Sequence, residues 1–265
     1  MNKTELLNKL ARDGEERVLL ARVMDKLKET GQKNIPACTP FLSPHESEAV
    51  SRLIAACGHP RHLLFGGYEG AERRVCLFLP DWMEDGRDAF DEEGPIAALR
   101  AVWHGGDVLS HRDFLGALMG MGVSRASVGD ILVGSGSCDI LLLREVAPFL
   151  RQSMDSAGRT RLSLSPISLS DLQPPQAQVK VIRDTVAALR LDAVAASGFS
   201  ISRSKAAGHI TAGHVSLNWQ ECTKPDHPVA QGDVISCRGL GKCVLTQVGG
   251  QSKKGRVMLV MERYI

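Results

Sequence analysis

Residues 200–218 of the chain, SISRSKAAGHITAGHVSLN, place cationic side chains at the start of a predicted helix. Ser202 is a favourable N-cap residue, and Arg203, Lys205 and His209 follow it on the outward face. Cations in the first turns oppose the helix dipole, which is positive at that end. They become favourable when an anion binds there, because the free backbone N–H groups and the cationic side chains attract the same group. The stretch therefore predicts a phosphate-binding surface.

The positive charge of the chain is concentrated in its last third. From residue 180 onward there are 12 Lys and Arg residues and 6 Asp and Glu residues, a net charge of +6. The preceding residues contain the other 20 basic and 24 acidic side chains and carry −4, so the 265-residue chain has a net charge of +2. A basic module attached to a nearly neutral carrier indicates a polyanionic partner.

Side chains that could support catalysis or hold a metal lack the spacing that such sites require. The seven cysteines are odd in number and contain no CxxC pair, and the eight histidines form no HxxxH or HExxH pattern. Ser110, His111 and Asp113 are neighbours on one predicted turn, which is not the arrangement of a nucleophile, a base and an orienting residue. Gly134-Ser-Gly-Ser lies between two predicted strands, whereas a cofactor-binding glycine turn leads into a helix. We therefore predict no catalytic residues, no metal and no cofactor.

The cysteine pattern and the hydropathy of the chain indicate a cellular compartment. Scattered cysteines without a framework are typical of reduced thiols in a cytosolic protein. No apolar run approaches 18 residues, and the charged N-terminal sequence lacks the apolar core of a signal peptide. We expect a cytoplasmic, monomeric protein with no membrane partner.

The N-terminal region begins with two helical patterns. Apolar residues between positions 4 and 30 recur mainly at spacings of three, four and seven, which predicts one or two helices ending at Gly31. Ser43 then begins another helix as its N-cap, with Pro44 at the first helical position and Glu46 completing a capping box. This helix is predicted to end near Ala56.

Two strands and an acidic segment complete this region. The strands are predicted at residues 62–68 and 74–80. Residues 81–95, DWMEDGRDAFDEEGP, contain seven acidic residues and one Arg without periodicity, which predicts a solvated loop. We therefore expect an N-terminal α/β region over residues 1–95.

Residues 96–170 have the element order β-α-β-β-α-β. The predicted elements are a strand at 96–102, a helix at 110–121, strands at 131–133 and 139–143, a helix at 145–154 and a strand at 161–167. This order is the split β-α-β pattern of ferredoxin-like and RNA-recognition-motif folds. The two strands in the middle of the segment carry no aromatic side chain for stacking RNA bases. We predict an α+β protein whose middle domain has this fold without base stacking.

A linker and a basic module follow. Residues 171–180 include a Pro-Pro pair, which resists helix formation and predicts a stiff spacer. In the module at 181–265, a short helix from Arg190 is expected to end at Gly198, before the helix that Ser202 caps. Strands are expected at residues 215–218 and 232–238, and a hairpin is expected from 244–248 and 257–261.

The basic module resembles the S4 RNA-binding domain. The matching residues are Arg190-Leu-Asp192, Gly198, Ser202-Arg203-Ser204-Lys205-Ala206, Ile210, Gly213, Val215, Leu217-Asn218, Gly232-Asp233-Val-Ile and Arg238-Gly239. The glycines, the helix cap and the basic positions are all in register with the S4 pattern. The resemblance implies that the module binds folded RNA by its shape and backbone.

Over roughly residues 40 to 265, the chain resembles the YlmH family of bacterial S4-domain proteins. The residues that carry this wider resemblance are Ser110–Gly116, Gly129–Leu132, Glu145–Phe149, Asn218-Trp219 and Gly249–Arg256. The resemblance implies binding to the large ribosomal subunit through its rRNA, together with peptidyl-tRNA. It also implies a role in ribosome-associated quality control of stalled nascent chains.

Two other functions stay open on the sequence alone. S4 domains accompany enzymes that modify rRNA, and a turnover or cofactor-binding assay would detect that activity. The YlmH family also has an older association with cell division, for which the helical N-terminus and the acidic segment 81–95 could act as an adaptor. A pull-down without RNA, using a chain neutralised at Arg203 and Lys205, would detect that role.

The expected RNA contacts lie mainly in the S4 domain, where Arg provides bidentate phosphate contacts and Lys a point charge. The principal candidates are Arg190, Ser202, Arg203, Lys205, His209, Arg238 and Lys242. Further candidates are Lys224 in a loop, Lys253, Lys254 and Arg256 in a hairpin turn, and His111, Arg112 and Arg125 in the middle domain.

Overall fold

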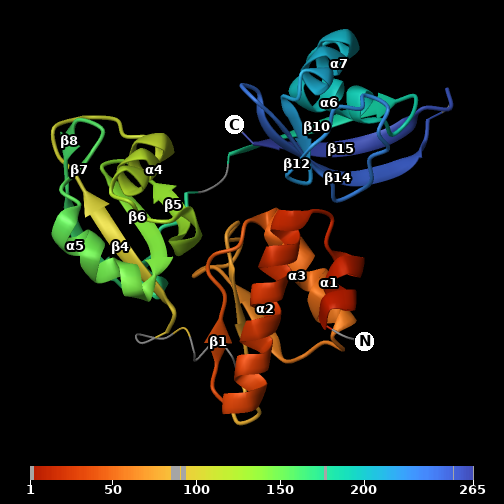
Figure 1. The fold of residues 1–265 in the computed structure, drawn as a ribbon. Coiled ribbons are helices and arrows are strands. Elements are labelled where there is room, and N and C mark those ends of the chain that lie inside the picture. The colour runs from red at the N-terminus through yellow and green to blue at the C-terminus, as the bar shows by residue number, and fades with distance from the viewer. Residues whose placement is uncertain (1–2, 85–89, 91–93, 176–177, 253, 265) are drawn as a thin grey trace. The chain divides into compact units, whose positions relative to one another are not determined.

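The computed structural model of the chain describes residues 3–84, 90, 94–175, 178–252 and 254–264. These residues fold into two compact units, Met1–Pro175 and Gln176–Ile265, and both units combine helices with strands (Figure 1). This composition confirms the predicted α+β class. Within the described ranges, no helix is both long enough and apolar enough to cross a bilayer.

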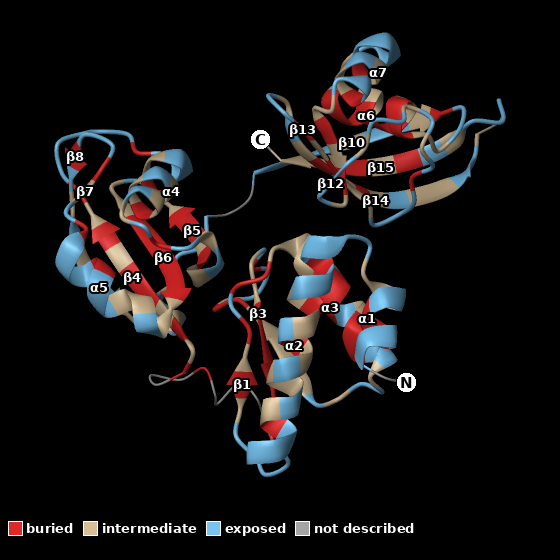
Figure 2. Ribbon diagram, viewed as in Figure 1, coloured by how far each residue is buried: buried red, intermediate tan, exposed pale blue. Residues whose placement is uncertain are grey.

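The N-terminal part of the first unit packs three helices against a small sheet. The helices are α1 (Lys3–Leu10), α2 (Gly14–Lys33) and α3 (Pro44–Ala56), and the antiparallel sheet has the order β1 (Ala37–Cys38), β3 (Val75–Phe78) and β2 (His62–Phe65). Leu20, Val50, Leu53 and Phe78 belong to the buried core of this part (Figure 2). The predicted helices and the two predicted strands are confirmed, and β1 is an additional short strand.

The end of α2 differs from the prediction. Gly31 lies inside the helix, which continues to Lys33 and ends at Asn34 with a left-handed φ of 54°. The Asn34 N–H donates to the Thr30 carbonyl at 2.9 Å and closes the last turn. Asn tolerates this conformation because its short polar side chain bonds locally. The prediction of a glycine stop at Gly31 is therefore wrong.

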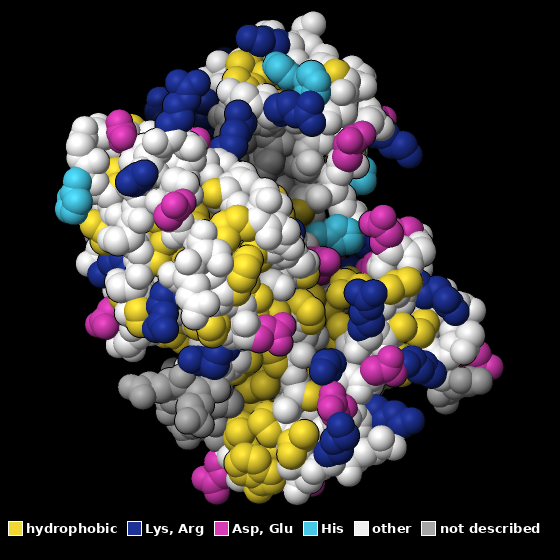
Figure 3. All heavy atoms as spheres, turned by 60° about the vertical axis from the view of Figure 1, so that its left-hand side comes forward, with side chains coloured by type: hydrophobic (Ala, Val, Ile, Leu, Met, Phe, Trp, Pro, Cys, Tyr) yellow, Lys and Arg dark blue, Asp and Glu magenta, His cyan; other side chains and the backbone are white. Residues whose placement is uncertain are grey.

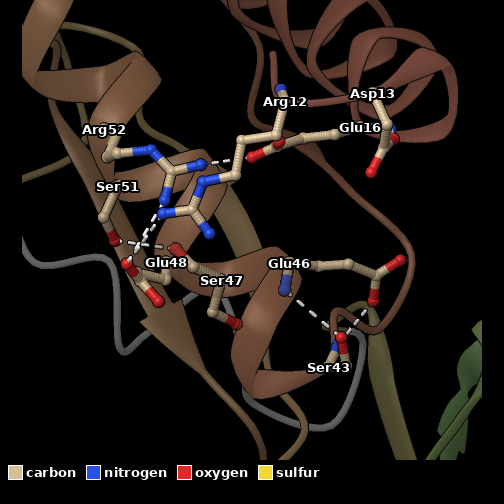
Figure 4. A network of polar contacts seen from close by, with 9 residues as sticks. All are labelled: Arg12, Asp13, Glu16, Ser43, Glu46, Ser47, Glu48, Ser51 and Arg52. Atoms are coloured by element: carbon tan, nitrogen blue, oxygen red, sulfur yellow. Dashed lines mark hydrogen bonds and ion pairs between the residues drawn. The ribbon is translucent and has the colours of Figure 1, made fainter. Parts of the chain in front are cut away.

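A buried carboxylate joins the turn between α1 and α2 to α3. Asp13 caps α2 by accepting from the Glu16 N–H at 2.8 Å, and Glu16 Oε2 accepts from the Arg12 N–H at 2.7 Å. Arg52 of α3 donates to the other carboxylate oxygen of Glu16, whose side chain is 5% exposed (Figure 4). A buried carboxylate is stable only when it is paired. Glu16 therefore fixes the helices of this part against one another.

We expect Ser43→Ala to destabilise the first unit by about 1 kcal/mol, because it removes the cap of α3. Ser43 Oγ accepts from the Glu46 N–H at 3.2 Å, and Glu46 Oε2 accepts from the Ser43 N–H at 2.6 Å, which confirms the predicted capping box (Figure 4). Chemical denaturation followed by circular dichroism measures the loss. Ser51→Ala is the matched control, because the Ser51 hydroxyl donates only to the Ser47 carbonyl within α3. Equal losses in the two variants would contradict the role of the cap.

The middle domain of the first unit is a four-stranded antiparallel sheet with two helices packed on one of its faces. Its elements are β4 (Ile96–Val102), α4 (His111–Gly120), η2 (Arg125–Ser127), β5 (Val128–Val133), β6 (Ser137–Leu143), η3 (Arg144–Val146), α5 (Ala147–Ser153), the small hairpin β7 (Ser156–Ala157) and β8 (Thr160–Arg161), and β9 (Ser163–Ile167). The strand order is β5-β6-β4-β9. This topology confirms the predicted β-α-β-β-α-β fold.

The two faces of this sheet are both covered. On one face, Leu99 and Ile140 pack with Phe114 of α4 and Leu150 of α5, and Trp103 is buried in the same cluster. On the other face, Ile96, Leu132 and Leu141 pack with Phe41 and Leu77 of the N-terminal part. RNA-recognition motifs bind bases on the face opposite their helices. In this chain that face contributes to a buried core.

An ion pair on the second face holds the segment that leaves the domain. Arg100 Nε and Nη2 donate to the two carboxylate oxygens of Asp139 at 2.6 and 2.8 Å. The Gln173 N–H donates to Asp139 at 2.9 Å, and Arg100 donates to the Asp171 carbonyl at 2.8 Å. The predicted linker begins at Asp171, which is also the last residue of the short helix η4 (Leu169–Asp171). Its residues Asp171 and Gln173 are thus bound to the sheet. This attachment was not predicted from the sequence, because it depends on an ion pair between residues 39 positions apart.

The second unit is a six-stranded sheet with two helices. The elements are β10 (Val179–Val186), α6 (Leu191–Phe199), α7 (Arg203–Thr211), β11 (Val215–Leu217), β12 (Gln220–Glu221), β13 (Val234–Cys237), β14 (Gly241–Gln251) and β15 (Val257–Tyr264), with the strand order β10-β15-β14-β13-β11-β12. The predicted helices, the predicted strands of the module and the terminal hairpin are confirmed. Leu191, Val194, Ile210, Ile235 and Met261 lie in its core (Figure 2).

Strand β10 was not predicted, and its first two residues lie in the predicted linker. It pairs with β15 along its whole length, from Val179 opposite Tyr264 to Val186 opposite Val257. As an edge strand it buries only Val186 fully. Its sequence therefore lacks the apolar alternation that identifies a half-buried strand.

Gly198 has a different role from the predicted helix stop. The helix α6 continues to Phe199, and Ser200 takes the left-handed conformation with a φ of 56°. A Cβ on Gly198 would lie 2.7 Å from Cys243 Sγ and 3.3 Å from Met261 Sδ. The glycine therefore permits close packing of α6 on the sheet. The prediction that Gly198 closes the helix is wrong.

Candidate nucleic-acid interface

Asp192 brings the first two candidate arginines together. It lies in the first turn of α6, and its side chain is only 7% exposed. Arg190 Nε and Nη2 donate to it at 3.2 and 3.1 Å, and Arg203 Nε and Nη2 donate to it at 3.1 and 3.0 Å. One carboxylate therefore fixes guanidinium groups from the starts of both helices.

The charges of this group explain how α7 tolerates a cation in its first turn. Burial acts to raise the pKa of Asp192, but the hydrogen bonds and charges of Arg190 and Arg203 outweigh it and lower that pKa. The ionised carboxylate offsets part of the unfavourable interaction between Arg203 and the helix dipole. Arg190 and Arg203 remain 41% and 54% exposed. Each guanidinium carries five N–H groups, so donors remain after the contacts with Asp192.

The start of α7 has the capped geometry that the sequence predicts. Ser202 Oγ accepts from the Lys205 N–H at 3.2 Å, and the Lys205 side chain is exposed. Ala206 and Ile210 are the buried residues of α7. Because residues two positions apart on a helix do not face the same side, Arg203 turns toward Asp192 of α6, whereas Lys205 lies on the exposed side of α7.

The loop of Lys224 lies beside this group. The Pro225 carbonyl accepts from the Asp192 N–H at 2.9 Å, so the residue after Lys224 is attached to the first turn of α6. Lys224 is exposed. We define the helix-start cluster as Arg190, Asp192, Ser202, Arg203, Lys205 and Lys224. Figure 3 shows Lys and Arg side chains at several places on the second unit, at the top of the view.

His209 and Arg238 lie at the other end of α7. The rings of His209 and His214 are 5.8 Å apart, and the Arg238 N–H donates to the His214 carbonyl at 2.9 Å. Because a helix rises 1.5 Å per residue, about 9 Å of α7 separates His209 from Arg203. His209 and Arg238 therefore lie apart from the two arginines that Asp192 holds together.

Lys242 lies on the face of the sheet opposite the helices. Its neighbour Cys243 is fully buried and packs near α6, and successive residues of a strand point to opposite faces. The Lys242 ammonium lies 4.3 Å from the centre of the Tyr264 ring, which is a cation–π contact. The structure therefore does not bring Lys242 together with Arg203.

Two of the tail candidates, Lys254 and Arg256, lie at the tip of the β14–β15 hairpin. Lys254 is exposed, whereas Arg256 Nε donates to Thr185 Oγ1 of β10 at 3.0 Å. A second Arg256 nitrogen donates to the Thr185 carbonyl. Lys253 is outside the described residues. Arg256 thus has a structural role within the sheet that the sequence analysis did not predict.

The middle-domain candidates fall into two places. His111 begins α4, and desolvation together with the nearby Arg125 lowers the pKa of His111. Arg125 Nη1 donates to the carbonyls of Val128 and Gly129 at 2.7 and 3.2 Å. Arg112 instead lines a small groove between α4 and the β7–β8 hairpin. Because Arg125 is bound to backbone carbonyls, local structure accounts for much of its hydrogen bonding.

Family models match both RNA-binding regions of the chain. The model described as "Putative RNA-binding domain in YlmH" matches residues 107–171, and the S4 domain model matches residues 189–235. The chain is 35% identical over 227 residues to "Ribosome-associated protein quality control protein P2" of Bacillus subtilis, covering 85% of this chain and 86% of the relative. The chain belongs to the YlmH family. This YlmH-family chain also resembles the solved structure of "Cell division protein ylmH from Streptococcus pneumoniae".

The likeness to that solved structure concerns the fold. Its TM-score is 0.50 at 20% sequence identity, and it covers 61% of this chain and 96% of the other. The family assignment confirms the resemblance predicted from the S4 pattern and from the wider motifs. It also agrees with the mixed helix and strand architecture of both units.

Asp192 is the member of the helix-start cluster that was not among the residues predicted from the sequence. It stands two positions after Arg190, inside the quoted S4 pattern, but only the fold brings Arg203 to it from the next helix. A carboxylate repels phosphate, which argued against selecting it on a predicted phosphate-binding surface. Its position in the first turn of a predicted helix could have identified it, because an acid there interacts favourably with the positive end of the helix dipole.

We expect Asp192→Asn to weaken RNA binding about threefold to tenfold, although the change removes a negative charge. The amide can no longer fix Arg190 and Arg203 through charge-assisted bonds, and such bonds are roughly twice as strong as neutral ones. Equilibrium titration of labelled RNA at fixed salt measures the change. Glu221→Gln is the matched control, because Glu221 is an exposed acid of the same unit that lies on β12, outside the helix-start cluster. Stronger binding in both variants would mean that Asp192 acts only as a repelling charge.

Proposed function

We propose that the chain binds the large ribosomal subunit through its S4 domain and acts in ribosome-associated quality control of stalled nascent chains. The helix-start cluster contacts rRNA phosphates, and the same domain helps to hold peptidyl-tRNA. Arg238, Lys242 and His209 make secondary RNA contacts away from this cluster. The protein acts by binding and not by catalysis.

The observation that carries this proposal is the pairing of Arg190 and Arg203 on one buried carboxylate. A surface salt bridge alone contributes little to stability. Here the pair orients exposed guanidinium donors next to the capped start of α7, which is the geometry that phosphate recognition requires. The 35% identity to a ribosome-associated quality control protein supports the ribosome as the source of that phosphate.

Four buried or partly buried thiols are unsuited to act as nucleophiles. Burial raises the pKa values of Cys38, Cys76 and Cys243 to about 12, and it also raises the pKa of Cys138. A thiol is nucleophilic only as its thiolate. These four cysteines are therefore protonated at neutral pH and pack as small apolar residues.

Sucrose-gradient sedimentation of lysate tests this function. The wild-type chain is expected to migrate with the large subunit at low salt and to move toward the top of the gradient as salt is raised, because phosphate contacts weaken with salt. Fractions that contain the chain are then probed for peptidyl-tRNA. Migration with the small subunit, or at the top of the gradient at both salt concentrations, would contradict the proposal.

A further inference from the structure

The hairpin between β11 and β12 has an unusual residue at its tip. Leu217 pairs with Gln220, which leaves Asn218 and Trp219 as a two-residue loop with φ values of 50° and 64°. Two-residue hairpins of type I′ need positive φ at both positions, and Asn-Gly is the preferred pair. Asn218 follows this preference. Trp219 occupies the glycine position, where a Cβ and a large side chain make the left-handed conformation costly.

The rest of the turn is constructed to hold this conformation. The Asn218 N–H donates to the Val234 carbonyl at 2.8 Å, and the Val234 N–H donates to Asn218 Oδ1 at 2.9 Å. Asn218 Nδ2 donates to Asp233 at 2.8 Å. Backbone strain persists where the surroundings fix it, and such positions are concentrated at functional sites. The backbone from which the Trp219 side chain projects is thus held in one conformation.

Packing within the unit leaves much of the tryptophan uncovered. Trp219 is 42% exposed, whereas Leu217 of the same hairpin is 9% exposed and belongs to the core. The residues that follow Trp219, Gln220 and Glu221, are exposed and polar. Glycine at this position would avoid both the strain and the exposed apolar ring. The exposed part of the indole is therefore available to a ligand.

We propose that Trp219 is a stacking platform for an unpaired nucleobase of the bound RNA. Every base presents a π-face that stacks on an aromatic ring, and the unit that carries Trp219 has a net charge of +6 from residue 180 onward. Protein-binding tryptophans are instead surrounded by contacts that exclude water. The polar neighbours at this tip fit a single stacked base better. This inference rests on the proposed RNA-binding function.

The test compares two RNA probes of equal phosphate number, a fully paired duplex and a duplex that contains an unpaired bulge. Trp219→Gly in the full chain is expected to weaken binding of the bulged probe about fivefold to 150-fold, the range for loss of one stacked base. The slope of affinity against salt should be unchanged, because no phosphate contact is lost. The thermal midpoint of the variant should rise, since Asn-Gly relieves the strain.

Three comparisons separate the outcomes. Trp219→Asn, which tolerates left-handed φ but has no ring, should lose affinity as Trp219→Gly does, and Trp219→Phe should retain most of it. Trp82→Ala is the matched control, because Trp82 is 60% exposed in the first unit. Wild-type affinity in Trp219→Gly, with weakened binding in Arg203→Ala/Lys205→Ala, would overturn the stacking proposal alone.

Two other results would also overturn it. If Trp219→Gly binds RNA normally but loses a protein that the wild type retains from nuclease-treated lysate, Trp219 anchors a protein partner. If the wild-type chain binds neither probe nor purified large subunits, the proposed function fails and the stacking inference fails with it.

Discussion

Replacing Arg203 and Lys205 together with alanine is expected to weaken RNA binding about 100-fold at low salt. Each lost bond to a charged partner contributes about 1.5–3 kcal/mol, and every 1.4 kcal/mol is about tenfold in affinity. The slope of log affinity against log salt should also fall by about two units, one for each phosphate contact. Titration of labelled RNA at several salt concentrations measures both quantities.

A matched variant shows whether position or charge is responsible for this loss. Lys180→Ala/Arg183→Ala removes the same charge from exposed positions on the edge strand β10 of the same unit. It should reduce affinity only slightly, because these residues lie outside the helix-start cluster. If both double variants weaken binding equally, the RNA responds to net charge and the proposed surface is wrong.

Replacing Asp139 with alanine is expected to destabilise the first unit by about 3–5 kcal/mol, the range for removing one partner of a buried ion pair. The side chain of Asp139 is 3% exposed, and its loss leaves Arg100 and the Gln173 N–H without their acceptor. Urea unfolding of the full chain, followed by circular dichroism, measures the change in the transition of the first unit.

The double variant Arg100→Leu/Asp139→Leu is the control for this effect. Apolar residues of similar volume often replace a buried ion pair without loss of stability, so the double variant should be much more stable than Asp139→Ala. It should still release residues 171–173 from the sheet, which hydrogen exchange at Gln173 detects. An Asp139→Ala chain as stable as the wild type would contradict the role of this ion pair.

Sequence analysis identified features that depend on local patterns. Ser43 and Ser202 were both predicted as helix caps, because capping needs only one polar side chain before a helix. The order of elements over residues 96–170 was sufficient to predict the split β-α-β fold, because each strand and helix carries its own periodicity.

Contacts between residues that are far apart in the sequence could not be predicted from local patterns. Arg203 meets Asp192 only after two helices have packed, and Arg100 meets Asp139 across adjacent strands. Lys242 was grouped with Arg203 by charge, although strand alternation places it on the opposite face of the sheet. The RNA contacts of Arg203 and Lys242 stay predictions, because they depend on a ligand that side-chain patterns do not describe.

Crosslinking of the wild-type chain to purified large ribosomal subunits, with mass spectrometric mapping of the attached peptides, tests the central claim most directly. The account predicts crosslinks to rRNA from peptides that contain Arg190, Arg203, Lys205 and Trp219, and their loss at high salt. Crosslinks confined to peptides from residues 1–175 would contradict it, because the S4 domain would then not carry the contact with the ribosome.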